Sequence, residues 1–238
     1  MMQPSQTIAG PARYHAAAIT VMACLWGCVP CSMALEEDET RLDLPDRKTQ
    51  VYSVIFVAFD CETTGFNPKK ERVVEIGAVK FRHGEVIEAR SWMMNPGTPI
   101  PVWASEVHGI TDDMVENKPS FKEAYPDFLA FTRGAVLIAH NAVFDISFIK
   151  AEAERAGLDV PPNDVLDSLK LFRVWLPGLK SYALEQVAKA LGVDAGGYHR
   201  ALADSVYVKL IFDKGLENQR RKLELGELAD DAQGALTF

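Results

Sequence analysis

The sequence predicts one α/β domain built on a mixed β-sheet with helices packed against it. Three strand-like segments come first along the chain, and helical segments then alternate with a further short strand, which is the order expected of such a sheet. A length of 238 residues leaves room for one core of ordinary size with flanking segments. Hydrophobic residues make up 48% and charged residues 24% of the chain, so a disordered, collagen-like or low-complexity protein is excluded.

Two segments precede the predicted domain. Residues 1–34 include a long uncharged and largely apolar stretch, which is typical of a signal peptide or a membrane anchor. The alternative is that translation begins at Met33, in which case the apolar stretch is not part of the protein. Residues 35–50 are acidic and contain Pro45, and we interpret them as a linker.

The strands of the predicted sheet are short runs rich in β-branched and aromatic residues. Residues 51–60 form the first strand, whose continuous apolar character indicates a buried central position. Residues 73–81 and 85–94 form the next two strands, joined at residues 82–84 by a hairpin turn that contains a glycine. Residues 135–139 are a further short apolar run and predict another buried strand.

Helical periodicity of apolar residues marks much of the remaining chain. One example is the stripe of Leu184, Val187 and Leu191, which lie at positions i, i+3 and i+7 of one helix face. The last residues, 216–238, are charged and end in an uncharged hexapeptide, and we expect them to form a flexible tail. The predicted helices are residues 120–132, 144–156, 168–176, 182–191 and 201–213.

Two carboxylates stand where the first predicted strand ends. Side chains alternate between the faces of a strand, so Asp60 and Glu62 share one face while Cys61 points to the other. Two negative charges this close repel each other unless a cation lies between them, which favours a divalent metal site. Ligation by carboxylates alone favours Mg or Mn over Zn. A solvated strand edge would also tolerate the pair, so these residues by themselves leave both interpretations open.

Two later segments carry polar residues at strand or helix ends. Residues 140–145 directly follow a predicted strand, where open α/β sheets bind their ligands, and Asp145 is either part of a site or a cap of the next helix. His140 is interpreted as a residue that fixes this loop by hydrogen bonds. His199 lies five residues before Asp204, which would set the two roughly 140° apart on a helix. We therefore expect His199 at or before the first helical turn, from where it can lean over the acids.

In this order, the three segments resemble the motifs of the DEDDh family of 3′-to-5′ exonucleases, in particular its proofreading members of the epsilon type from bacterial DNA polymerase III. The motifs are residues 59–65, 140–145 and 199–204, and the resemblance covers residues 51–215. The histidine at position 199 indicates the His branch of the family, because the tyrosine of the other branch would stand at position 200. The resemblance implies a ribonuclease H-like mixed β-sheet flanked by helices in a single domain.

The resemblance also implies a chemistry. Asp60, Glu62, Asp145 and Asp204 would hold two divalent cations, Mg or Mn, and His199 would take the proton of the attacking water. The reaction would be hydrolysis of terminal phosphodiesters at the 3′ end of single-stranded DNA, with release of nucleoside monophosphates. Such an enzyme serves proofreading or repair.

The expected substrate contacts follow the first motif. Thr63, Thr64 and Gly65 would approach the terminal nucleotide, while His108 either lines that pocket or has a structural role in its loop. The net charge of −8 argues against a nucleic-acid partner held by a broad basic surface. Cations at the acid cluster would neutralise phosphate locally and let the enzyme hold only a strand end.

The chain end suggests a further partner. Gln233, Leu236 and Phe238 fit the Gln-x-x-Leu-x-Phe pattern with which proteins similar to epsilon bind the bacterial sliding clamp, and a short extended peptide can place two apolar side chains in a groove. An ordinary disordered end is the alternative. A clamp, a polymerase subunit and DNA are intracellular partners, so we predict a cytoplasmic protein with no stable membrane role. Residues 16–34 would instead make it exported or membrane-anchored.

Two rival functions remain open at the level of sequence. The same site could cleave RNA or short oligoribonucleotides, and rates on matched DNA and RNA oligomers would separate the two. The chain could also be a catalytically idle module that binds the clamp. The complete set of four acids and one histidine argues against an idle module.

Overall fold

The computed structural model describes residues 45–193, 199–219 and 223–238, which belong to one compact unit. The predicted leader, residues 1–34, lies outside the described residues, as does most of the predicted linker. Within the described ranges, no helix combines the length and the apolar character that crossing a membrane would require. The cytoplasmic location stays a prediction.

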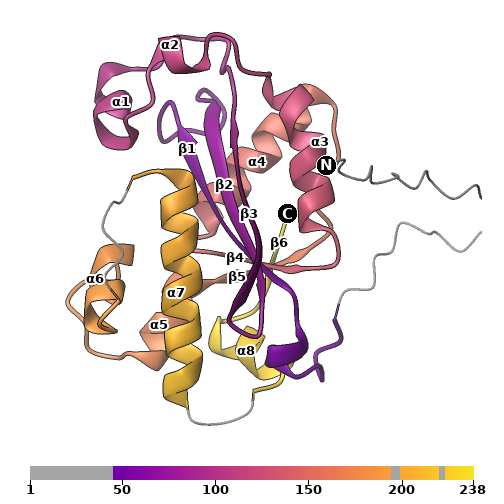
Figure 1. Ribbon diagram of the computed structural model, residues 1–238, viewed down its shortest axis with the longest axis vertical. Coiled ribbons are helices and arrows are strands. Elements are labelled where there is room, and N and C mark those ends of the chain that lie inside the picture. Colours follow the sequence, from indigo (N-terminus) through magenta and orange to yellow (C-terminus); the bar gives the residue numbers. More distant parts are fainter. Residues whose placement is uncertain (1–44, 194–198, 220–222) are drawn as a thin grey trace, which may run out of the picture. The chain divides into compact units, whose positions relative to one another are not determined.

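Within the described residues, the strands form one mixed sheet in the order β3-β2-β1-β4-β5-β6 (Figure 1). β1 lies inside the sheet, antiparallel to β2 on one side and parallel to β4 on the other. This arrangement confirms the predicted α/β class and its ribonuclease H-like mixed sheet. The strands are β1 (Phe56–Thr63), β2 (Val73–Arg82), β3 (Glu85–Met93), β4 (Val136–Ala139), β5 (Asp164–Asp167) and β6 (Leu236–Thr237).

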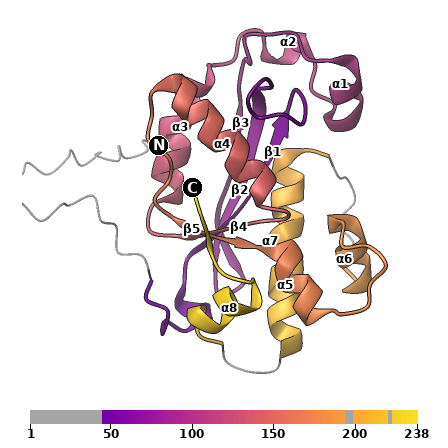
Figure 2. The same ribbon diagram turned by 180° about the vertical axis from the view of Figure 1, so that it is seen from behind.

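Helices cover both faces of this sheet. α3 and α4 pack on one face, and α5, α7 and α8 pack on the other (Figures 1 and 2). α1 and α2 lie near the end at which β1 finishes (Figure 2). The helices are α1 (Val102–His108), α2 (Asp112–Val115), α3 (Phe121–Thr132), α4 (Val143–Ala156), α5 (Ser168–Trp175), α6 (Leu184–Ala190), α7 (Ala201–Gln219) and α8 (Leu225–Asp231).

The central strand β1 divides its side chains between the two layers. Val57 and Phe59 are buried in the cluster beneath α3 and α4, whereas Phe56 and Ala58 are buried on the side of α7. Because side chains of a strand alternate with period two, positions 60 and 62 fall on the α7 side. The packing of the strand therefore decides which helix the two acids face.

The first predicted strand is wrong at its start. Val51–Ser53 form a 3₁₀ turn, and β1 begins only at Phe56 and continues to Thr63. The reason is tertiary: Val51 is buried, and its N–H donates to the carbonyl of Leu223 near α8 instead of to a strand partner. An apolar run that packs against a distant segment has the same composition as a buried strand.

The other predicted strands, and the helices before α7, are confirmed to within two residues at each end. β5 was not predicted, because an acid at each end of its four residues interrupts the apolar pattern. α1 and α2 were also missed, since α1 has only seven residues and α2 only four, too few for a clear helical period. The last predicted helix, 201–213, is too short, because α7 continues to Gln219.

The prediction of a flexible tail at residues 216–238 is wrong for the residues that the structure describes there. α8 buries Leu225 and Leu228 in the cluster on the α7 side of the sheet. β6 then pairs with β5 as an antiparallel edge strand, with Leu236 opposite Val165. These residues are folded because the apolar positions among the charges find a core to cover.

Candidate active site

The structure brings three of the predicted acids together on the α7 side of β1. Ligand oxygens of Asp60, Glu62 and Asp204 all lie within 4.8 Å of one another. Asp60 and Glu62 lie near the end of β1, and Asp204 lies in the first turn of α7. Cys61, between the first two, points into the core on the opposite face, as the alternation predicts. The cluster is a possible metal-binding site.

α7 can carry Asp204 to this place because β2 allows a close approach. A Cβ at Gly77 would lie 2.1 Å from the carbonyl carbon of Ala201, so no residue with a side chain fits there without a shift of the helix. The Ser205 hydroxyl also donates to the Gly77 carbonyl at 2.9 Å. The first turn of α7 is therefore seated directly on the β2 backbone.

The electrostatics of the cluster favour a bound cation. Burial, together with Asp145 and the two other acids, raises the pKa of Asp60 well above its usual range. Burial and the Asp204 charge raise the pKa of Glu62 to about 7, and burial also raises the pKa of Asp204. Carboxylates packed this closely are costly to ionise together, and a divalent cation between them removes that cost.

One atom tests directly whether the residues fit such a cation. Asp204 Oδ1 is buried and has no hydrogen-bond partner among the described residues. The other oxygen, Oδ2, accepts the N–H of His199 at 3.1 Å. A buried carboxylate oxygen without a donor is costly unless something absent from the protein satisfies it, and it lies beside two further carboxylates. The donor set fits a hard divalent cation such as Mg or Mn.

Asp145 lies next to this cluster without joining the group of three. It stands in the first turn of α4, and its Oδ1 accepts the Cys61 N–H at 3.0 Å. Burial raises the pKa of Asp145 to about 8, although hydrogen bonds from backbone N–H groups, including that of Cys61, act in the opposite direction. Its charge in turn raises the pKa of Asp60. Its role as a ligand stays a prediction.

His199 precedes α7, where the sequence predicts it. Its backbone is left-handed with a φ of 69°, and its N–H donates a hydrogen bond to the Asp204 carboxylate. The side chain is 58% exposed, with Nε2 3.7 Å from Glu185 Oε1 of α6. The charge of His199 lowers the pKa of Asp204, which is raised overall by burial. The imidazole is therefore at the solvent side of the cluster and does not point into the core.

A cavity of about 170 Å³ opens beside Glu62. Its walls come from the end of β1, from α1 and from the start of α4. Of the predicted substrate residues, Thr63, Gly65 and His108 line it, whereas Thr64 does not. The lining residues are Cys61, Glu62, Thr63, Gly65, Phe66, Trp103, Ala104, Val107, His108 and Phe144.

His108 has the structural role that the sequence analysis considered, and its contact with a nucleotide stays a prediction. It lines the cavity, and its Nδ1 accepts the N–H of Ile110, which fixes the turn after α1. Burial lowers the pKa of His108 below its usual range, which favours the uncharged imidazole. A neutral ring in this position offers an uncharged wall to a ligand.

Two aromatic residues at the cavity were missed by the sequence analysis. Phe66 and Trp103 stack on each other with ring centroids 5.3 Å apart and an angle of 18° between the rings. They remain 79% and 46% exposed, which is unusual for large aromatic side chains. Exposed aromatic faces are surfaces on which nucleic-acid bases stack. The only sequence signal was an aromatic residue directly after Gly65, and nothing in the sequence paired it with Trp103.

His140 fixes its loop, as predicted. Its Nδ1 lies 2.9 Å from the Ser168 hydroxyl, and its Nε2 lies 2.7 Å from the Tyr182 carbonyl. Neighbouring Asn141 donates its N–H to Asp167. These bonds connect the β4–α4 loop to α5 and to the segment before α6.

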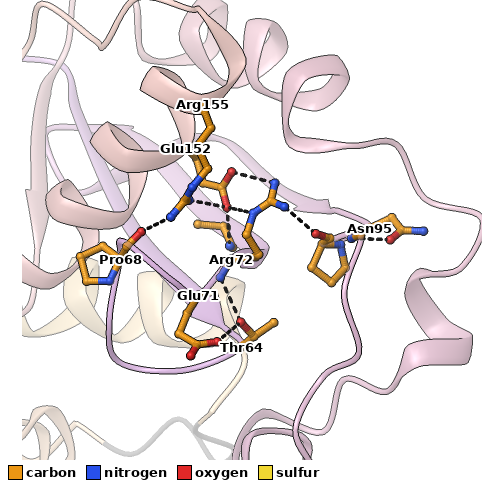
Figure 3. A network of polar contacts seen from close by, with 10 residues as sticks. Thr64, Pro68, Glu71, Arg72, Asn95, Glu152 and Arg155 are labelled. Carbon is orange, nitrogen blue, oxygen red and sulfur yellow. Dashed lines mark hydrogen bonds and ion pairs between the residues drawn. The ribbon is translucent and has the colours of Figure 1, made fainter.

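An ion pair between Arg72 and the buried Glu152 fastens the loop between β1 and β2 (Figure 3). Gly65 and Phe66 lie in this loop. Glu152 of α4 accepts two hydrogen bonds from Arg72, at 2.6 and 3.0 Å, and is 1% exposed. The Arg72 N–H donates to the Thr64 hydroxyl, which itself donates to Glu71. Thr64 is thus a member of the network that shapes the loop.

The predicted clamp-binding residues are partly used by the domain itself. Leu236 lies in β6, and Phe238 packs with its ring 6.4 Å from that of Phe59. Gln233 is exposed in the turn after α8. The two apolar residues of the pattern are therefore half-buried against the core in this structure.

A mixed sheet with carboxylates gathered at the end of an inner strand defines the class of this protein, a ribonuclease H-like nuclease. Residues 57–212 match the family model described as Exonuclease (RNase_T), and the chain belongs to this exonuclease family.

Relatives and solved structures agree with this assignment. The chain is 42% identical over 162 residues to a DNA polymerase III of the PolC type from Caldanaerobacter subterraneus subsp. tengcongensis, which covers 68% of this chain and 12% of that protein. It is 39% identical over 154 residues to the DNA polymerase III subunit epsilon of Treponema pallidum. That match covers 64% of this chain and 72% of the subunit. Exonuclease X, solved in complex with 5′ overhanging duplex DNA, is 25% identical with a TM-score of 0.60, over 74% of this chain and 99% of that one.

Proposed function

We propose that the protein is a 3′-to-5′ exonuclease that removes nucleoside monophosphates from the end of a DNA strand. The observation that carries the proposal is the cluster of Asp60, Glu62 and Asp204, with their ligand oxygens within 4.8 Å and one buried oxygen of Asp204 unsatisfied. The chain spans only a small part of the PolC-type relatives, so the substrate and the pathway are inferred from the site itself and from the family.

Asp60, Glu62 and Asp204, with Asp145 beside Asp60, would hold two divalent cations, Mg or Mn. When bound, such cations neutralise charge on the phosphate and stabilise the oxygens that enter and leave in the displacement. The net reaction joins a water oxygen to phosphorus and breaks the bond from phosphorus to the 3′ oxygen. Its products are a nucleoside 5′-monophosphate and a strand with a new 3′-hydroxyl.

The remaining steps belong to side chains of the protein. His199 is exposed at the edge of the cluster, and its imidazole accepts the proton of the attacking water. The cavity beside Glu62 takes the terminal nucleoside, against the neutral ring of His108. The stacked faces of Phe66 and Trp103 hold a base next to it, since aromatic stacking accepts any base.

Replacing Asp60 tests the proposal most directly. Asp60→Asn keeps the shape of the side chain and removes the charge, so we expect Mg-dependent digestion of a single-stranded DNA oligomer to fall by at least about a thousandfold. The matched control is Asp159→Asn, an exposed carboxylate outside the cluster, which should digest at the wild-type rate. Undiminished release of nucleotides by a folded Asp60→Asn protein would reject the assignment.

DNA is proposed over RNA because Exonuclease X, a solved structure at 25% identity, is bound to DNA, and because several curated relatives are DNA polymerase III proteins. Rates on DNA and RNA oligomers of one sequence separate the two substrates. Faster digestion of the RNA would make the protein an RNA exonuclease. An idle binding module would release no nucleotide from either oligomer.

A sliding clamp and a polymerase subunit are proposed as protein partners. Clamp binding through Gln233, Leu236 and Phe238 requires β6 to leave the sheet edge, because the two apolar residues contact the core of the domain. Gln233 is exposed with a φ of 58°, which Asn tolerates, so Gln233→Asn leaves the fold intact. We expect this variant to lose binding to a purified bacterial clamp. Equal binding by the variant and the wild type would exclude the proposed peptide.

A further inference from the structure

Glu75 is a buried carboxylate near the start of β2, opposite Glu62 of β1 in the strand register but not one of the three clustered acids. The residue is 1% exposed. A charge in such a position is costly unless donors surround it. Glu75 accepts the Ser91 hydroxyl at 2.6 Å, two bonds from Arg200 at 3.0 and 3.1 Å, and the Ala201 N–H at 3.3 Å. Most of these donors come from the start of α7, which is distant in sequence.

The pairing holds the two residues that follow His199 in the chain. Arg200 donates to Glu75 from Nε and Nη2, which lie on one edge of its guanidinium, and the Ala201 N–H donates to the same carboxylate. The carbonyl of Arg200 accepts the Asp204 N–H at 2.9 Å, and Asp204 in turn accepts the N–H of His199. Any shift at Arg200 is therefore transmitted to both functional residues of the third motif.

His199 needs such an anchor because its backbone is strained. A φ of 69° is uncommon for a residue with a side chain and persists only where the surroundings enforce it. The hydrogen bond from His199 to Asp204 cannot enforce this conformation by itself, because both residues would move together with the start of α7. Glu75 supplies the fixed point, because it stands on the same strand as Gly77, against which α7 is seated.

We propose that Glu75 and Arg200 are positioning residues of the active site, which hold the first turn of α7 so that His199 and Asp204 face the acids of β1. The proposal rests on the proposed exonuclease function. Neither residue touches the substrate in this role. Each acts through the backbone of residues 199–201.

The protein contains its own control for this idea. Arg72 and Glu152 form a second pair, in which the glutamate is also 1% exposed and accepts two hydrogen bonds from the arginine and one from the Val73 N–H. Arg155 Nη1 also lies 3.2 Å from Glu152 Oε1. That pair fastens the β1–β2 loop to α4 (Figure 3). Among the described residues, neither Arg72 nor Glu152 has a hydrogen bond to α7. Loss of either pair should cost stability, but only loss of the first should displace His199.

The experiment compares Glu75→Gln and Arg200→Lys with Glu152→Gln and Arg72→Lys. Lysine keeps the charge of arginine and loses its two-pronged geometry. For the Glu75 and Arg200 variants we expect kcat to fall about tenfold to a hundredfold with KM nearly unchanged, since a small misplacement of catalytic groups has an effect of this size. For the Glu152 and Arg72 variants we expect KM to rise with kcat nearly unchanged, because the β1–β2 loop lines the cavity proposed to take the nucleoside.

A second readout needs neither metal nor substrate. The chain has five histidines, so the imidazole NMR signal of His199 can be assigned by comparison with His199→Ala. The His199 signal should shift in Glu75→Gln. It should keep its wild-type position in Glu152→Gln, even where the two variants lose a similar amount in melting temperature. If Glu75→Gln fails to fold, the Arg200→Lys variant provides the test. Arg200 is 45% exposed, and a lysine at this position still gives Glu75 a positively charged partner.

The outcomes separate this proposal from the function on which it rests. A shifted His199 signal with lowered kcat supports the positioning role. A wild-type signal and wild-type kcat in a destabilised Glu75→Gln or Arg200→Lys protein would show a purely structural pair and overturn it. A wild-type protein without nuclease activity would end the proposed function, and the NMR comparison would then still decide whether Glu75 and Arg200 hold His199 in place.

Discussion

At the scale of single residues, the alternation of a β-strand was enough to predict that Asp60 and Glu62 share a face. That inference needs only the period of the pleat, and it holds in the structure. The sequence could not show Trp103 beside Phe66, because their contact depends on how α1 lies near the end of β1. Glu75 was equally hidden, since a lone acid in an apolar strand gives no sign of its partner 125 positions away.

Glu62 provides a test of the cluster through the pH dependence of stability. Its pKa is raised from its ordinary range near 4.5 to about 7 in the folded protein without metal. Between these two values the folded state binds more protons than the unfolded state, so the free energy of unfolding falls as the pH rises through this window. The contribution is about 3 kcal/mol at most, and it is fully lost above pH 7.

The variant Glu62→Gln isolates this effect, because glutamine resembles the protonated acid at every pH. In the presence of EDTA we expect equal melting temperatures near pH 4.5 and a more stable variant at pH 8. Mg should stabilise the wild type more at pH 8 than at pH 5, since it binds the ionised acids. A difference between variant and wild type that does not change with pH would contradict the assigned pKa.

At the scale of elements, local patterns predicted what local patterns control. The helix at 120–132 carries its own start signal, because the side chains of Ser120 and Glu123 form a capping box. The turn of Val51–Ser53 and the folded chain end were wrongly predicted for the opposite reason. Their conformations depend on each other, through the bond between Val51 and Leu223, and no local period encodes that pairing.

The seat of α7 on β2 is the contact between elements on which the site depends most. In Gly77→Ala the added methyl would lie 2.1 Å from the Ala201 backbone, so the helix must move away from the sheet. We expect a loss of about 3 kcal/mol or more in the free energy of unfolding, at the upper end of overpacking effects. Activity should fall as well, at temperatures where the variant is still folded, because Asp204 moves with the helix.

Urea unfolding of Gly77→Ala checks this expectation. Ala203→Gly serves as the control, since it weakens α7 by about 1 kcal/mol through helix propensity without pressing on β2. A free energy of unfolding of Gly77→Ala that differs from that of the wild type by less than about 0.5 kcal/mol is what an ordinary surface substitution gives. That result would show that α7 does not contact β2 as described.

At the scale of the whole molecule, the charge of −8 and the acid cluster imply a particular way of holding DNA. A protein that covers many phosphates with basic side chains binds tightly at low salt and releases counterions. Here the described site is a small cavity with two exposed aromatic rings beside carboxylates. The substrate is therefore expected to be held at its end, by stacking and by local neutralisation at the acids.

This mode of binding predicts a weak dependence of KM on monovalent salt and on strand length. With Mg fixed, a plot of log KM against log salt should have a slope of only about 1 to 2, because few phosphates are neutralised by side chains. For the same reason, a six-nucleotide and a thirty-nucleotide DNA should differ in KM by less than about threefold, since the extra phosphates make no ionic contact. A slope near 6, or a steep fall of KM with length, would require an extended basic surface and would overturn the end-binding model. Both measurements use steady-state conditions at one saturating Mg concentration, so that the occupancy of the acid cluster by the cation does not change with salt.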